Sequence, residues 1–286
     1  MYTHKSTHRW FVGLIVSLTA AVLLYPWPIL GAETVPVHPL TAKPTLDGNG
    51  ADWAKVPAVQ VQLKGKLGIG AITVKCGTYK GEVFLLVSWK DPTEDTQHKP
   101  FVWDKTQGKY VAGPQREDRL ALQFAMTGQY TANWFSGNSF TADMWHWKAA
   151  RSNPSGLAHD KMTIVSTTPM KKAFETKAEN GKTIYIRRPG DTGDKLYKTV
   201  RYTKHQGDMV PKYVLAPNPK GSVTDVKARG VWNNGVWTVE LSRKLNTGNK
   251  DDVVFRKGKT VLGGIAVFNQ SGDDKHDVSD TLQFRF

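Results

Sequence analysis

The sequence predicts an all-β protein built as an antiparallel β-sandwich. Short segments in which apolar and polar residues alternate recur along the chain, and alternation of this kind is typical of half-buried strands. The 26 glycines and 15 prolines are spread between these segments, where they favour turns. No long amphipathic helical pattern interrupts the series, so we expect only a few short helices.

The clearest strands are arranged as hairpins. Residues 71–75 lead through the turn Tyr79-Lys80-Gly81 into residues 83–89, whose apolar side chains fall on both faces and predict a strand buried on both sides. Asn234-Gly235 joins residues 231–232 to 236–241 and is the strongest short signal for a type I′ hairpin turn. Further strands are predicted at 119–126, 261–269 and 281–286.

Residues 142–151, with the sequence ADMWHWKAAR, form the most informative segment. In a strand, Trp145 and Trp147 share one face, and Met144, His146 and Lys148 share the other. Methionine, histidine and neutral lysine all carry lone pairs that can bind iron. Two interpretations follow: one wall of a cofactor site, or a tryptophan pair in the core with a solvated opposite face.

The N-terminal residues have the layout of a secretory signal peptide. Lys5 and Arg9 precede the apolar run 11–25, and a break at Pro26 leads to small residues that end at Ala32. Leu30 is not the small residue preferred before a cleavage site, so an uncleaved anchor is the alternative. Removal of residues 1–32 leaves 254 of 286 residues, which we expect to form a single domain over 33–286. The polar and basic stretch at about 157–225 is predicted to be a long excursion from the sheet.

Composition restricts the function. The formal net charge is +14, yet there is no nucleic-acid-binding motif, and the basic segment 171–204 is either a solvated loop or a docking surface. The single cysteine, Cys76, excludes an internal disulfide, a covalently attached c-type haem and four-cysteine zinc or iron–sulfur sites. There is no nucleophile elbow and no phosphate-binding loop. The adjacent acids Glu117 and Asp118 are expected to be solvated. The sequence therefore favours binding over catalysis.

Several motifs occur in order at 46–53 (LDGNGADW), 89–93 (WKDPT), 118–121 (DRLA), 143–154, 235–245 and 266–268. Together they resemble the ethylbenzene-dehydrogenase-related haem-binding domain, and the resemblance covers about residues 42–286. That domain is the γ subunit of type II members of the dimethyl sulfoxide reductase family, such as ethylbenzene dehydrogenase and the selenate, chlorate and nitrite oxidoreductases.

The resemblance implies a β-sandwich like the jelly roll of carbohydrate-binding module family 9, and one noncovalent haem b. It implies an electron-transfer subunit rather than the catalytic chain. Its partners would be an iron–sulfur β subunit, a molybdenum α subunit and an external carrier such as a cytochrome c. The implied location is the periplasm, with membrane association as an alternative.

In this family a methionine before the Trp-His-Trp-Lys strand and a lysine in the last loop ligate the iron. This chain has Ser136, Gly137 and Asn138 where that methionine is expected, so Met126 and Met144 are the nearest substitutes. The last loop offers Lys275 and His276. Neutral histidine ligates readily near pH 7, whereas lysine must first lose its proton. The remaining candidate cofactor-binding residues are Trp145, His146, Trp147 and Lys148 as a wall of the haem slot, and Arg151 and Arg243 as propionate partners.

Two other functions stay open at this stage. The ten tryptophans suit a carbohydrate-binding sandwich, in which Trp145 or Trp232 would be exposed on a concave face. Alternatively, the domain keeps the fold and acts as a docking subunit without haem.

Overall fold

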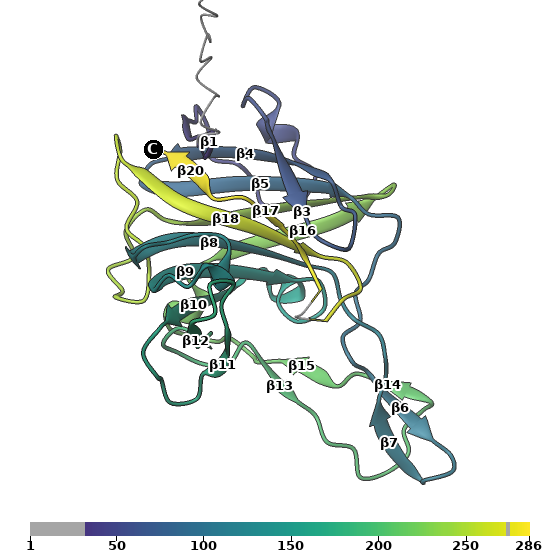
Figure 1. Cartoon of the computed structure of the whole chain (residues 1–286). Helices are drawn as coiled ribbons and strands as arrows, with labels where there is room; N and C mark the ends of the chain where they lie inside the picture. The colour runs from purple at the N-terminus through teal and green to yellow at the C-terminus, as the bar shows by residue number, and fades with distance from the viewer. Residues whose placement is uncertain (1–31, 273–274) are drawn as a thin grey trace, which may run out of the picture. The chain divides into compact units, whose positions relative to one another are not determined.

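The computed structural model describes residues 32–272 and 275–286, and residues 32–286 form one compact unit (Figure 1). Apart from Ala32, the predicted signal peptide lies outside the described residues. Within the described part of the chain, no helix combines the length and the apolar character needed to cross a membrane.

Fifteen strands form one continuous sheet that closes around a core as two layers, which confirms the all-β antiparallel prediction. The first layer runs β11 (Phe174–Lys177), β12 (Thr183–Arg187), β10 (His159–Ser166), β9 (Phe140–Lys148), β8 (Arg119–Gly128) and β18 (Thr260–Phe268). The second runs β3 (Val59–Lys64), β4 (Ala71–Tyr79), β5 (Glu82–Lys90), β17 (Val236–Lys244) and β16 (Lys227–Asn233). β19 (Asp277–Ser279) connects them by pairing with β18 and β3.

The remaining elements are short. β1 (Glu33–Pro36) pairs in parallel with β20 (Leu282–Arg285), and β20 pairs antiparallel with β18. β2 (His38–Pro39) pairs in parallel with β4. Two small sheets contain β13 (Tyr197–Thr199) with β15 (Tyr213–Leu215), and β14 (Met209–Val210) with β6 (Phe101–Asp104) and β7 (Lys109–Ala112). Four single-turn 3-10 helices are η1 (Ala51–Trp53), η2 (Trp134–Ser136), η3 (Asn153–Ser155) and η4 (Ser222–Thr224).

The predicted turns are confirmed by their backbone angles. Lys80 and Gly81 have φ of 43° and 82°, and Asn234 and Gly235 have φ of 49° and 80°. Positive φ at both central residues is the type I′ geometry that matches the twist of the flanking strands. The strand β5 is buried on both faces, as its continuous apolar sequence predicts.

Three tryptophans form the centre of the core at one end of the sandwich. The Trp147 ring centroid lies 5.0 Å from that of Trp237 and 6.3 Å from that of Trp89. Each indole N–H has a side-chain acceptor: Asn153 for Trp147, Asp118 for Trp237 and Asp91 for Trp89. Buried indoles are stable in a core when the N–H is satisfied in this way.

The prediction of an excursion beginning at residue 157 is wrong for its first part. β10 pairs with β9 over seven residues, and β12 and β11 extend the same layer. The alternation in β10 went unrecognised because polar Asp160 and Thr163 occupy buried positions where apolar residues are expected. The segment after β12 leaves the sheet and carries β13, β14 and β15, of which β14 lies beside β6 and β7 in Figure 1.

Candidate functional site

The outer face of β9 is buried, although it points away from the tryptophan core. Met144, His146 and Lys148 are exposed by only 3%, 5% and 3%. Trp145 and Trp147 lie between the two layers, as alternation requires, and so do not reach this outer face. The outer side chains are therefore enclosed by other parts of the chain, and solvation of this face, one of the two interpretations, is wrong.

His146 has no hydrogen-bond partner for either ring nitrogen. Burial, with the charge of Lys148 as the next cause, holds the pKa of His146 well below its usual value, so the imidazole is neutral. Its ring stacks near Phe268, with 5.9 Å between centroids. A buried polar ring without partners is costly, and such groups commonly mark a bound group or a reactive position.

The last loop packs against Phe268, the ring that His146 also approaches. The His276 ring lies 4.7 Å from the Phe268 ring, on which the Arg119 guanidinium also packs at 4.1 Å. Cross-strand register explains this, because Lys148, Arg119 and Phe268 are successive neighbours across β9, β8 and β18. Arg119 further donates to the carbonyl of Ser271 at 2.7 Å.

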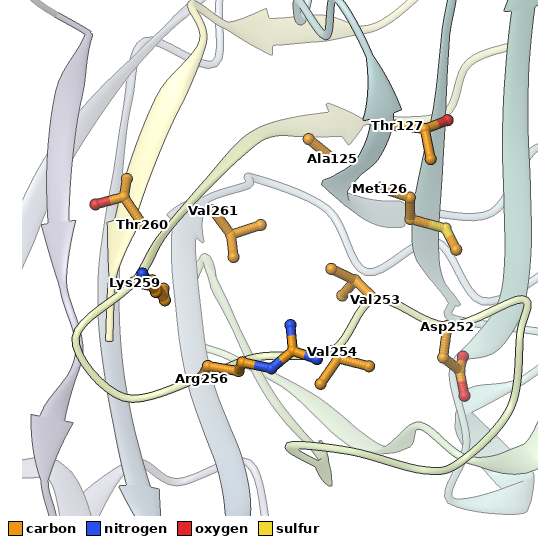
Figure 2. A pocket seen from close by; sticks show the side chains of 10 residues that line it. All are labelled: Ala125, Met126, Thr127, Asp252, Val253, Val254, Arg256, Lys259, Thr260 and Val261. Carbon is orange, nitrogen blue, oxygen red and sulfur yellow. The ribbon is translucent and has the colours of Figure 1, made fainter.

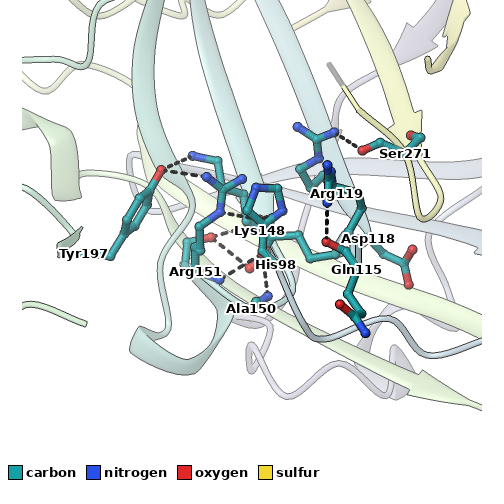
Figure 3. Close-up of polar contacts among 12 residues, drawn as sticks. His98, Gln115, Asp118, Arg119, Lys148, Ala150, Arg151, Tyr197 and Ser271 are labelled. Carbon is teal, nitrogen blue, oxygen red and sulfur yellow. Dashed lines mark hydrogen bonds and ion pairs between the residues drawn. The ribbon is translucent and has the colours of Figure 1, made fainter. Parts of the chain in front are cut away.

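Lys148 is held by one residue of β10 and one of the segment that leaves the sheet. Its Nζ lies 2.9 Å from His159 Nδ1 and 3.2 Å from the Tyr197 hydroxyl (Figure 3). Burial, followed by the charges of Lys161 and Arg151, keeps the pKa of Lys148 well below its usual value. Burial and Lys148 lower the pKa of His159 to about 2. Burial therefore disfavours the charged form of both groups, and a deprotonated nitrogen is what metal coordination requires.

A cationic cavity of about 380 Å³ adjoins these residues. Burial and the nearby Arg151 lower the pKa of His98, in its wall, to about 2, so the positive charge comes from the arginines and Lys99. Guanidinium groups match carboxylates bidentately, so the cavity suits an anionic ligand. The lining consists of His98, Lys99, Arg116, Arg119, Arg151, Tyr213 and Gly272.

Arg151 is fixed by a buried acid. Glu117 accepts hydrogen bonds from the Arg151 side chain, from the Arg151 N–H at 3.0 Å and from the Ala150 N–H at 2.7 Å (Figure 3). Glu117 and Asp118 are both 0% exposed, so the expectation that this pair is solvated is wrong. Burial and the charge of Asp91 raise the pKa of Asp118 to about 7. Asp118 accepts from the Trp237 indole and Glu117 is enclosed by Arg151 and His98, and the local sequence indicates neither contact.

Arg243 does not face this cavity. It is 2% exposed and lies between the layers, where its Nη1 contacts Asp143 and Asp252. Its Cζ also lies 5.1 Å from the Trp145 ring centroid. Its role as a propionate partner is therefore not supported, because β17 belongs to the second layer and directs this side chain inward.

Met126 lies at the other end of β8. It lines a separate cavity of about 340 Å³ with Arg256 and Lys259 (Figure 2). Phe268 pairs with Arg119, seven residues before Met126, so roughly 23 Å of strand separates Met126 from the position of His276. Met126 is therefore not brought together with His276. Met144 shares the outer face with His146, and Lys275 is exposed.

The tryptophans do not form a sugar-stacking surface. Trp145 is 0% exposed, and Trp232 is half-buried and donates to the Asp91 carbonyl at 2.9 Å. Among the described residues no tryptophan is exposed. The expectation of an exposed Trp145 or Trp232 is wrong, and the tryptophan argument for carbohydrate binding is lost with it.

Sequence reasoning missed His98, Arg119, His159, Tyr197 and Phe268 as members of the site. Arg119 and Phe268 stand at the ends of strands whose opposite faces are apolar, which is the only local signal they give. His159 begins β10, whose alternation is obscured by buried polar residues, and His98 and Tyr197 come from segments that cover the sheet, where no sequence period indicates position.

Comparison with solved structures gives matches of low similarity. A candidate carbohydrate-binding protein from Bacteroides uniformis aligns with 89% of this chain and 100% of its own at 10% identity and a TM-score of 0.41. A family 9 carbohydrate-binding module from Caldicellulosiruptor kristjanssonii, solved with cellotriose, aligns over 88% and 94% at 10% identity and a TM-score of 0.39.

Sequence comparison is more specific. No curated protein matches the chain in a sequence search. The sequence model described as ethylbenzene dehydrogenase, in contrast, matches residues 50–279. This range includes β9, the Arg119–Arg151 cavity and the last loop. The chain therefore belongs to the ethylbenzene dehydrogenase family.

Proposed function

We propose that this chain is a haem b-binding electron-transfer subunit of an exported molybdenum oxidoreductase. Membership of the ethylbenzene dehydrogenase family implies a subunit of a multi-subunit oxidoreductase. The finer proposal depends on one observation: His146 is buried, neutral and without a partner for either nitrogen. Neutral imidazole is a good iron ligand, so an iron centre would satisfy a group that the protein alone leaves unsatisfied.

The residues around His146 fit such a group. His146 would supply one nitrogen ligand to the iron, His276 is a further donor at the same end of the sheet, and Met144 is a further donor on the outer face of β9. Arg119 and Arg151 would bind the propionates, and Glu117 keeps Arg151 in position. Phe268 and Tyr197 exclude water from the donors. The haem would supply one-electron transfer, and this chain would hold it between an iron–sulfur subunit and an external carrier.

Replacing His146 with leucine tests the proposal. Wild-type protein from a haem-replete host should contain one haem b per chain, measured as the pyridine haemochrome, and His146→Leu should contain at least about tenfold less, which requires a loss of more than about 1.4 kcal/mol of binding free energy. Leucine removes two unsatisfied buried nitrogens, so the haem-free variant should be at least as stable as haem-free wild type.

His205→Leu is the matched control, because the His205 side chain is 49% exposed and lies in the β13–β15 segment. It should retain full haem content. Equal haem in His146→Leu and wild type would reject His146 as a ligand. Absence of haem from the native complex would reject the haem proposal and favour a docking subunit without haem.

A further inference from the structure

The interior of the first layer contains a cluster of buried aspartates outside the haem-related site. Asp143 on β9 and Asp160 on β10 are 0% exposed, Asp252 is 4% and Asp191 is 8% exposed. Alternation directs Asp143 and Asp160 inward with Trp145, away from His146. The cluster therefore joins two strands, the loop before β18 and the start of the segment that leaves the sheet at Asp191.

Five carboxylate oxygens in this cluster are buried without a hydrogen-bond donor. They are both oxygens of Asp160, both oxygens of Asp191 and Oδ1 of Asp143. The other Asp143 oxygen accepts from the Val253 N–H at 3.0 Å and from Arg243. The oxygens without a donor are therefore those that do not contact Arg243. Native proteins rarely leave buried polar atoms without a partner.

The charge balance is also unfavourable. Four carboxylates against the single guanidinium of Arg243 leave three uncompensated negative charges when all are ionised. Asp251, which accepts from the Thr192 N–H at 2.9 Å, adds a fourth at the edge of the cluster. Buried charges of one sign require either protons or a cation.

The spacing matches a calcium ion. One oxygen each from Asp143, Asp160 and Asp252 lie within 4.8 Å of one another, and so do oxygens of Asp191, Asp251 and Asp252. Two oxygens on one calcium ion, each 2.3–2.6 Å from it, are at most about 4.6–5.2 Å apart, so the oxygens of each group are close enough to share an ion of this size. The donors are all oxygen, which selects a hard cation over zinc or copper.

We propose that Asp143, Asp160, Asp191 and Asp252 bind a calcium ion, with Asp160 as the central ligand. The ion ties the segment that follows β12 to the sandwich, because Asp191 lies where that segment leaves the sheet. The Asp191 N–H already donates to the Asp160 carbonyl at 3.2 Å, so the backbone brings the two carboxylates together. This site is independent of haem binding.

The test compares wild type with Asp160→Asn in EDTA and in calcium chloride. Wild type should bind calcium in a titration calorimeter, and at about 100 times the Kd its Tm should rise by about 5–10 °C over EDTA. Asp160→Asn should lose this shift. In EDTA it should have a higher Tm than wild type, since the amide removes one buried charge and can donate to Asp143 Oδ1.

Asp208→Asn is the matched control, because its side chain is 78% exposed, and it should keep the full calcium shift. Terbium emission excited through tryptophan gives a second measurement, since Trp145 is the cross-strand neighbour of Asp160. Calcium-independent Tm in wild type, with no terbium emission, would overturn the proposal and show that protons neutralise the cluster. An unchanged calcium shift in Asp160→Asn would also overturn it.

Discussion

Arg243→Met is expected to lower the free energy of unfolding by about 3–5 kcal/mol, the usual cost of removing one partner from a buried ion pair. Arg243 is the cation that contacts Asp143 and Asp252, and its side chain is 0% exposed. Methionine fills much of the same volume but leaves both carboxylates without compensation. Urea unfolding in EDTA, followed by tryptophan fluorescence, measures the loss.

Two comparisons make this result specific. Arg229→Met alters an exposed arginine on the neighbouring strand β16 and should change stability by no more than about 0.5 kcal/mol. Adding Asp143→Asn and Asp252→Asn to Arg243→Met should restore a large part of the loss, because the uncompensated charges are then gone. A loss below about 1 kcal/mol for Arg243→Met alone would show that the network contributes little to stability.

Trp147→Ala is expected to cost about 3–5 kcal/mol, the range for removing a large aromatic side chain from a core. The indole is 0% exposed, packs on Trp89 and Trp237, and bonds Asn153 at 3.0 Å. Its removal leaves a cavity and an amide oxygen with one donor fewer. Thermal and urea unfolding measure the loss, and Trp103→Ala, in the half-buried β6–β7 hairpin, should cost less.

A double variant tests whether contact with Trp147 is the reason that position 230 must be glycine. A Cβ at Gly230 would lie 2.3 Å from Trp147 Cζ2, so Gly230→Ala in wild type should cost about 1–3 kcal/mol through overpacking. In the Trp147→Ala background the clash is absent, and Gly230→Ala should be nearly neutral. Additive losses would show that Gly230 is required for a different reason.

The fold was predictable where one local pattern determined the answer. Alternation in β9 separates Trp145 and Trp147 from His146 and Lys148, and the Lys80-Gly81 and Asn234-Gly235 turns set their hairpins. The sequence does not predict β10, because Asp160 occupies a buried position where an apolar residue is expected, and its charge must be neutralised by a proton or compensated by a cation. A residue pattern shows which positions share a face, but it does not identify the distant group that compensates a buried charge.

Part of the candidate site was also predictable, because a residue pattern shows which positions of a strand share a face. His146, Lys148, Arg151 and His276 lie at one end of the first layer, and their role in binding a cofactor stays a prediction. Met126 and Arg243 do not, since register along β8 and the inward direction of β17 decide their places. Covering residues such as Tyr197 belong to irregular segments, and their position depends on tertiary contacts rather than on sequence period.

The pairing of β1 with β20 determines when the sandwich can be completed. Val35 is the register partner of Phe284, so this contact closes a loop of nearly the whole described chain. Such distant pairings form slowly, since the chain entropy is lost before the contact is gained. Until β20 pairs with β18, one part of β18 remains an unpaired edge. Open edges promote intermolecular association. A chain shortened before Leu282 should therefore aggregate or be degraded, rather than persist as a smaller version of the same domain.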